Sequence, residues 1–100
     1  MEKFHNTGIS TVVIREICNL ARKYSVNKVI LFGSRARGDQ KAKSDVDLAF
    51  SGGDGVRFTL AVDEETSTLL KFDVVNLDVN VQPQLLESIQ REGMVLYEKI

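Results

Sequence analysis

Apolar and polar residues follow one another along this chain with two periods, one typical of helices and one typical of strands. Near the amino terminus apolar residues, Val12 and Val13 among them, recur every three or four positions. This spacing predicts an amphipathic helix over residues 10–24, capped by Thr7 or Ser10. Later in the chain, short runs rich in Val, Ile, Leu and Phe and bounded by Gly, Ser, Asn or Asp predict strands.

The complete pattern predicts one domain over residues 1–100, with residues 1–8 frayed. The expected helices cover residues 10–24, 35–38, 56–65 and 83–92, and the expected strands cover residues 29–32, 44–50, 72–77 and 94–97, the last being a strand or an extended tail. Alternating elements of this kind indicate an α/β (α+β) fold, a small mixed β-sheet flanked by helices. We expect the other face of the sheet to be open to solvent and to carry the polar site.

The stretch from residue 29 to residue 50 holds the candidate chemistry. The apolar run at 29–32 ends at Gly33-Ser34, and residues 35–38 form barely one turn of helix. A Gly-Ser step with free backbone N–H groups at a helix start is suited to phosphate oxygens. Arg35 and Arg37 add positive charge beside it. The turn therefore predicts a phosphate-binding site.

Two carboxylates follow at the start of the next strand. Asp45 and Asp47 are two positions apart, so they share one strand face, while the apolar Val46, Leu48 and Phe50 share the other. Their Cα atoms would lie roughly 6–7 Å apart. Without a cation, each charge would oppose ionisation of the other. Oxygen ligands beside a phosphate site favour Mg²⁺ or Mn²⁺ over zinc.

The strand at 72–77 contains a third acid inside an apolar run. A charge there needs a cation or a hydrogen bond, although a plain strand-end aspartate is the alternative. Asp73 and Asp78 are an odd number of residues apart, so in a regular strand they point to opposite faces. Only one of the two should reach the first pair of carboxylates, and spacing alone does not choose between them.

Two simpler interpretations compete with this one. Ser44-Asp45 can be an ordinary turn with Asp47 a solvated residue, and Gly52-Gly53 can be a second glycine-rich phosphate loop. The second is disfavoured because no Lys-Ser or Lys-Thr follows it. The first is disfavoured because the glycine turn and the paired acids occur together between two predicted strands.

Composition narrows the class of protein. The chain has 100 residues, 43% of them hydrophobic, and a formal net charge of −1, which gives no basic excess for direct binding of nucleic acid. A core of this size gives marginal stability, so we expect an oligomer or a hetero-complex. The single cysteine excludes an internal disulfide, and no apolar run is long enough for a membrane span, so we expect a cytoplasmic protein.

These motifs resemble a known family. Gly33-Ser34, Arg35-Ala36-Arg37-Gly38 and Ser44-Asp45-Val46-Asp47-Leu48 are similar to the signature of the DNA polymerase beta-type nucleotidyltransferases. More narrowly, the chain resembles the minimal nucleotidyltransferases (MNT) of prokaryotic toxin–antitoxin pairs, whose partner is a HEPN-domain toxin. The resemblance implies the polymerase beta-like fold and transfer of AMP from ATP (AMPylation) to a hydroxyl group.

The resemblance also assigns roles to residues. It selects Asp73 as the third carboxylate and implies two Mg²⁺ ions, with Mn²⁺ possible. The implied metal ligands and catalytic residues are Asp45, Asp47 and Asp73, and the implied nucleotide-binding residues are Gly33, Ser34, Arg35 and Arg37.

The acceptor is inferred from what this chain lacks. Larger transferases of this resemblance carry a second domain that binds the acceptor, and none is expected here, so a protein acceptor fits best. We expect a tyrosine of the partner HEPN toxin to be modified. The alternatives are a non-catalytic antitoxin that neutralises the toxin by contact and an aminoglycoside-type transferase acting on a small molecule.

Overall fold

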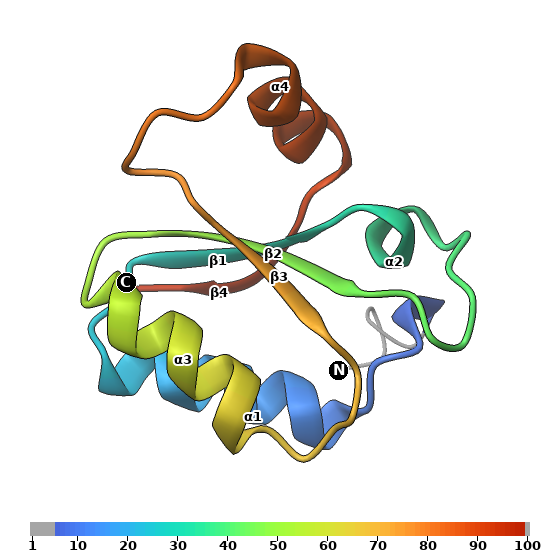
Figure 1. Cartoon of the computed structure of the whole chain (residues 1–100), viewed down its shortest axis with the longest axis horizontal. Coiled ribbons are helices and arrows are strands. Elements are labelled where there is room, and N and C mark those ends of the chain that lie inside the picture. The colour runs from blue at the N-terminus through green and yellow to red at the C-terminus, as the bar shows by residue number, and fades with distance from the viewer. Residues whose placement is uncertain (1–5, 100) are drawn as a thin grey trace.

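The computed structural model describes residues 6–99, with helices and strands in the predicted order (Figure 1). The helices are α1 (Thr11–Lys23), α2 (Ser34–Arg37), α3 (Gly55–Glu65) and α4 (Pro83–Glu92), and the strands are β1 (Lys28–Phe32), β2 (Val46–Ser51), β3 (Phe72–Asn76) and β4 (Met94–Glu98). The predicted mixed α/β fold is therefore confirmed. The last segment is a strand rather than an extended tail, and Asp45 immediately precedes β2.

The strands form one sheet in the order β3-β2-β1-β4. Strand β1 runs antiparallel to both β2 and β4, whereas β2 and β3 are parallel. The carboxyl end of β1 therefore lies beside the amino ends of β2 and β3. We call this the site end of the sheet, and the end where β2 and β3 finish the opposite end.

Helices α1 and α3 cover one face of the sheet, as Figure 1 shows. The Ser10 side chain accepts a hydrogen bond from the N–H of Val13 and caps α1. From the sheet, Phe50 meets Phe58 of α3 edge to face, with ring centroids 5.4 Å apart. Full burial of a side chain such as Phe58 contributes about 1.5–3 kcal/mol. This face holds most of the core.

Helix α4 lies on the other face, which the sequence predicted to be open. Pro83 occupies its first turn and Gly93 ends it, with the Gly93 N–H donating to the carbonyl of Ile89. Ile89 is buried in a second apolar cluster with Phe32 and Ala49. The expectation of an open face was therefore wrong where α4 covers β1 and β2. Asp47, on the same side of β2 as Ala49, lies on this face at the site end.

Two local expectations were also wrong. In α1, Ile14 is buried and Val12 is 52% exposed, so the helix presents a slightly different stripe to the core. Residues 6–8 were expected to be frayed, but Thr7 is buried and its carbonyl accepts a hydrogen bond of 2.8 Å from Arg35. The fraying predicted for residues 1–5 lies outside the described residues. No helix within residues 6–99 is long and apolar enough to span a membrane.

Candidate active site

The glycine turn joins β1 to α2 at the site end of the sheet. Gly33 has φ 76° and ψ −157°, a conformation that an L-residue adopts only with strain. The N–H groups of Ala36 and Arg37 both donate to the Gly33 carbonyl at 3.1 Å, which closes the first turn of α2. The first N–H groups of a helix have no carbonyl partner within it. The turn therefore presents backbone donors at the end of β1.

The turn lies directly against one of the predicted carboxylates. Phe32, the last residue of β1, pairs with Asp47 of β2. A Cβ atom at position 33 would collide with Oδ2 of Asp47. Glycine is therefore required here by its neighbour as well as by its positive φ. The predicted phosphate turn and the predicted metal ligand therefore lie next to each other.

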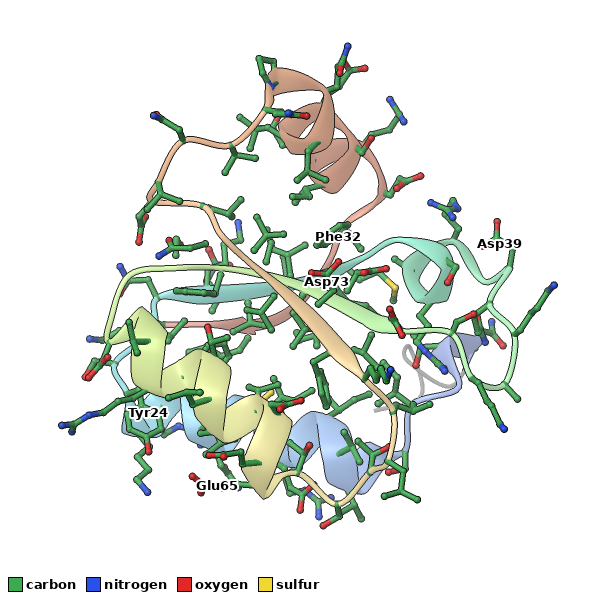
Figure 2. All side chains as sticks on the ribbon, viewed as in Figure 1. Tyr24, Phe32, Asp39, Glu65 and Asp73 are labelled. Carbon is green, nitrogen blue, oxygen red and sulfur yellow. The ribbon has the colours of Figure 1, made fainter. Side chains whose placement is uncertain are left out.

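The third carboxylate reaches the same place from the neighbouring strand. Asp47 pairs with Asp73 in the parallel register of β2 and β3, where strands lie about 4.8 Å apart. Figure 2 labels Phe32 and Asp73, the residues that flank Asp47 on β1 and β3. Asp45 lies just before β2, two residues from Asp47, so alternation along the strand puts both on the same face. Asp45 and Asp73 are both exposed. The structure brings the three acids together.

Burial and the neighbouring charges both affect the ionisation of Asp47. Partial burial is the main factor that raises the pKa of its carboxyl, and the charges of Asp73 and Asp45 raise it further. The positive charge of Arg37 acts in the opposite direction. Among the described residues, no three acidic, histidine or cysteine side chains are gathered closely enough to hold a metal ion as they stand. The site thus consists of carboxylate oxygens, which can act as metal ligands, and it carries an excess of negative charge.

Asp78, the alternative to Asp73 as the third carboxylate, lies away from the other acids. Asp78 follows β3 at the opposite end of the sheet, where its carboxylate accepts a hydrogen bond of 2.6 Å from the N–H of Gly52. A Cβ atom at Gly53 would meet the carbonyl oxygen of Tyr24. The Gly52-Gly53 turn therefore packs on the connection after α1 and has a structural role. The Gly52 N–H, which a phosphate loop would offer to a ligand, is already bonded to Asp78.

Arg35 occupies a different position from the one expected for a phosphate ligand. Its side chain is only 2% exposed, and its guanidinium donates to the carbonyls of Thr7, Ala42 and Ser44 at 2.8–3.2 Å. These bonds hold the loop before Asp45 against the segment before α1. The sequence contains no signal for this role, because carbonyl acceptors are present at every residue.

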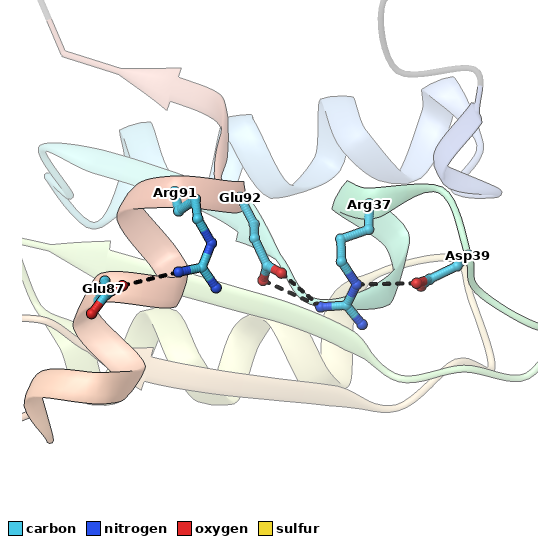
Figure 3. Close-up of polar contacts among 5 residues, drawn as sticks. All are labelled: Arg37, Asp39, Glu87, Arg91 and Glu92. Atoms are coloured by element: carbon cyan, nitrogen blue, oxygen red, sulfur yellow. Dashed lines mark hydrogen bonds and ion pairs between the residues drawn. The ribbon is translucent and has the colours of Figure 1, made fainter.

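Arg37 remains at the surface beside the site. It donates to Glu92 at 3.0 Å and to Asp39 at 3.1 Å, so it links α2 to the last residue of α4 (Figure 3). Its side chain is 45% exposed. Glu92 was not among the predicted site residues, because nothing in the sequence relates it to Arg37. Of the two predicted arginines, only Arg37 is available to a bound anion.

The comparisons with known proteins agree with this arrangement. The sequence profile of the family described as "Polymerase beta, Nucleotidyltransferase" matches residues 15–100. A protein of Methanocaldococcus jannaschii, described as a proposed protein adenylyltransferase, is 36% identical over an alignment 96 residues long. The alignment covers 84% of this chain and 94% of the relative.

Solved structures share the fold. A toxin–antitoxin crystal structure with AMP-PNP is similar with a TM-score of 0.68 at 22% identity, over 86% of this chain and 73% of that one. A protein from Shewanella oneidensis gives a TM-score of 0.66 at 12% identity, over 91% of this chain and 74% of that one. The family match, the relative's sequence and the fold agree: this chain belongs to the polymerase beta-type nucleotidyltransferases.

Proposed function

We propose that this protein transfers AMP from ATP to a tyrosine hydroxyl of a partner HEPN-domain toxin and so acts as its antitoxin. One observation carries the proposal: the Gly33-Ser34 turn lies against Asp47, which pairs with Asp73 of β3 and follows Asp45 by two residues at one end of the sheet. A phosphate site beside clustered carboxylates is the arrangement that nucleotidyl transfer needs. The relative described as a proposed protein adenylyltransferase and the toxin–antitoxin structure with AMP-PNP support this choice of donor and partner.

The donor set fits divalent cations. Asp45, Asp47 and Asp73 offer only carboxylate oxygens, which suit Mg²⁺ or Mn²⁺. Partial burial, and after it the charges of Asp73 and Asp45, raise the pKa of Asp47, and a bound cation would offset both effects. Because Asp45 and Asp73 are exposed, their side chains are free to turn toward Asp47. When bound, two Mg²⁺ ions would neutralise charge that develops on the attacking and leaving oxygens.

The residues of this chain then have distinct tasks. The backbone N–H groups of the Gly33-Ser34 turn hold the β- and γ-phosphates, and Arg37 adds positive charge beside them. Asp73 takes the proton of the acceptor hydroxyl. The acceptor oxygen forms a bond to the α-phosphorus, and the bond from that phosphorus to pyrophosphate breaks. Arg35 is not included among the nucleotide ligands, because its donors are used by carbonyl groups.

The test is to incubate the protein with Mg²⁺, ATP and the purified HEPN toxin encoded beside it, and to measure the toxin's mass. We expect one or a few AMP groups on a toxin tyrosine. The Asp45→Asn/Asp47→Asn protein, which keeps the shape of both side chains, should leave the toxin unmodified. If the toxin stays unmodified but is silenced equally by both proteins, the contact-only antitoxin is correct and the transfer proposal is wrong.

A further inference from the structure

A surface hollow opens next to the site, on the side away from the phosphate turn. Its volume is about 750 Å³, and it is lined by Lys43, Asp45 and residues 67–71. The last of these form the loop between α3 and β3 in Figure 1. Asp45 therefore belongs both to the carboxylate cluster and to the wall of this hollow.

The wall of the hollow is firmly built. The N–H and the hydroxyl of Ser67 donate to the carboxylate of Glu16 on α1 at 2.7 and 2.6 Å. At the other end of the loop, the carbonyl of Lys71 accepts a hydrogen bond of 2.8 Å from Val46 at the start of β2. The segment is thus anchored to α1 and to the strand that carries Asp47. A surface held at both ends is preorganised for binding.

The lining of the hollow combines exposed apolar side chains with two lysines and one acid, Asp45. The Leu69 side chain is fully exposed, at 103% of its reference area, although a leucine is usually at least partly covered. Val12 is also exposed and lies one turn before Glu16, on the helix face that holds Ser67. Lys43 and Lys71 are both exposed at the rim. The protein as a whole has a net charge of −1, so this positive charge is local.

The position of the hollow matches the geometry of the reaction. The phosphate turn follows β1, the carboxylates lie on β2 and β3, and the hollow is at the start of β3. In an in-line displacement the attacking group enters opposite the leaving group. With pyrophosphate at the turn, the acceptor approaches from the β3 side, which is where the hollow lies.

We propose that this hollow docks an acidic, partly apolar segment of the acceptor protein and presents its hydroxyl group to Asp73. The inference rests on the proposed function and specifies which sequences around the acceptor are recognised. Lys43 and Lys71 pair with acidic side chains of the segment, and Leu69 packs against an apolar one. Two lysines at the rim suit carboxylates better than they suit the neutral base of a nucleotide.

The test uses two short fluorescein-labelled peptides, each with one tyrosine and flanking leucines. One carries glutamates, and its twin carries lysines in their place. Fluorescence anisotropy with Mg²⁺ and AMP-PNP present measures their binding. We expect the acidic peptide to bind at least about tenfold more tightly than its twin, as two or more exposed ion pairs allow.

Matched variants locate the effect. Lys43→Gln/Lys71→Gln should remove most of the preference for the acidic peptide, and Leu69→Ser should weaken binding of that peptide. Lys99→Gln, which removes an exposed charge next to β4 at the opposite end of the sheet, should change neither. Calorimetry should give the same affinity for Mg²⁺–ATP in all of these proteins.

Three outcomes would overturn the docking proposal. The first is that the wild-type protein binds both peptides with the same affinity or binds neither. The second is that the preference for the acidic peptide survives in Lys43→Gln/Lys71→Gln. The third is that this variant no longer binds Mg²⁺–ATP, which would assign the hollow to the nucleotide base. If wild-type protein binds no Mg²⁺–ATP but still prefers the acidic peptide, the proposed function fails and the docking surface stands.

Discussion

The two ends of the sheet use the same kinds of residue for different purposes. Each end has a glycine turn with positive φ next to a strand, and each has aspartates close by. At the opposite end the acids are satisfied, because Asp78 accepts from the N–H of Gly52 and Asp54 accepts from the N–H of Arg57 to cap α3. There the aspartates stabilise the turn and the helix.

At the site end the acids face one another. Asp47 pairs with Asp73 across the strands, and no hydrogen bond among the described residues reaches either carboxylate. Partial burial is the main factor that raises the pKa of Asp47, and the charges of Asp73 and Asp45 raise it further. Carboxylates left without donors in a folded protein are candidates for binding a cation. The acids of the two ends therefore differ in their hydrogen bonds, which a sequence motif alone does not show.

The largest expected effect contrasts Asp73 with Asp78. Asp73→Asn removes a charge from the cluster and should lower the rate of AMP transfer by more than about a hundredfold. Loss of a residue that only supports a metal ligand costs up to about a hundredfold, and Asp73 is proposed to be a ligand itself, so the loss should be at least as large. Asp78→Asn keeps an oxygen that can accept from Gly52, so transfer should stay within about threefold of wild type. Single-turnover transfer of radiolabelled AMP measures both. If Asp78→Asn loses more transfer activity than Asp73→Asn, then Asp78 and not Asp73 is the third carboxylate of the site.

The next effect contrasts the two glycine turns. Gly33→Ala places a methyl group against Asp47 and should weaken Mg²⁺–ATP binding by at least about tenfold. Gly53→Ala places one against the Tyr24 carbonyl and should reduce the free energy of unfolding by about 1–3 kcal/mol. Calorimetry and urea denaturation distinguish the two results. If a folded Gly33→Ala protein binds ATP with unchanged affinity, the phosphate-binding site is not at this turn.

The smallest effect concerns the stability of the metal-free protein. Because the folded state raises the pKa of Asp47, ionisation of this group opposes folding. Its contribution to stability is fully present below the unfolded pKa of about 3.9 and is lost as pH rises through the raised folded value. Asp47→Asn should therefore raise the Tm at neutral pH by roughly 1–4 °C while abolishing transfer.

Thermal unfolding at several pH values in EDTA measures this difference, which should disappear in acid. Asp63→Asn on the exposed end of α3 serves as the control and should leave the Tm unchanged. Added Mg²⁺ should raise the Tm of wild type more than that of Asp47→Asn. An Asp47→Asn protein that is less stable than wild type at neutral pH would show that the carboxylate is satisfied after all.

The sequence by itself determined the order of the elements and the main residues of the candidate site. Local chemistry was sufficient for this, because apolar spacing, a capping serine, Pro83 and the glycines define where helices and strands begin and end. The Gly33-Ser34 turn and the Asp45/Asp47 pair are close in sequence, so their proximity in space follows from one strand–turn–strand unit.

Only the tertiary structure decided which distant groups meet. It paired Asp73 with Asp47 through the parallel register of β2 and β3, buried Arg35 among three carbonyls, and brought Glu92 to Arg37. It also laid α4 over part of the face that was expected to be open. These contacts join residues that the chain separates, and they depend on sheet register and helix packing. Local propensity carries no information about either, because the partners are chosen by the whole fold.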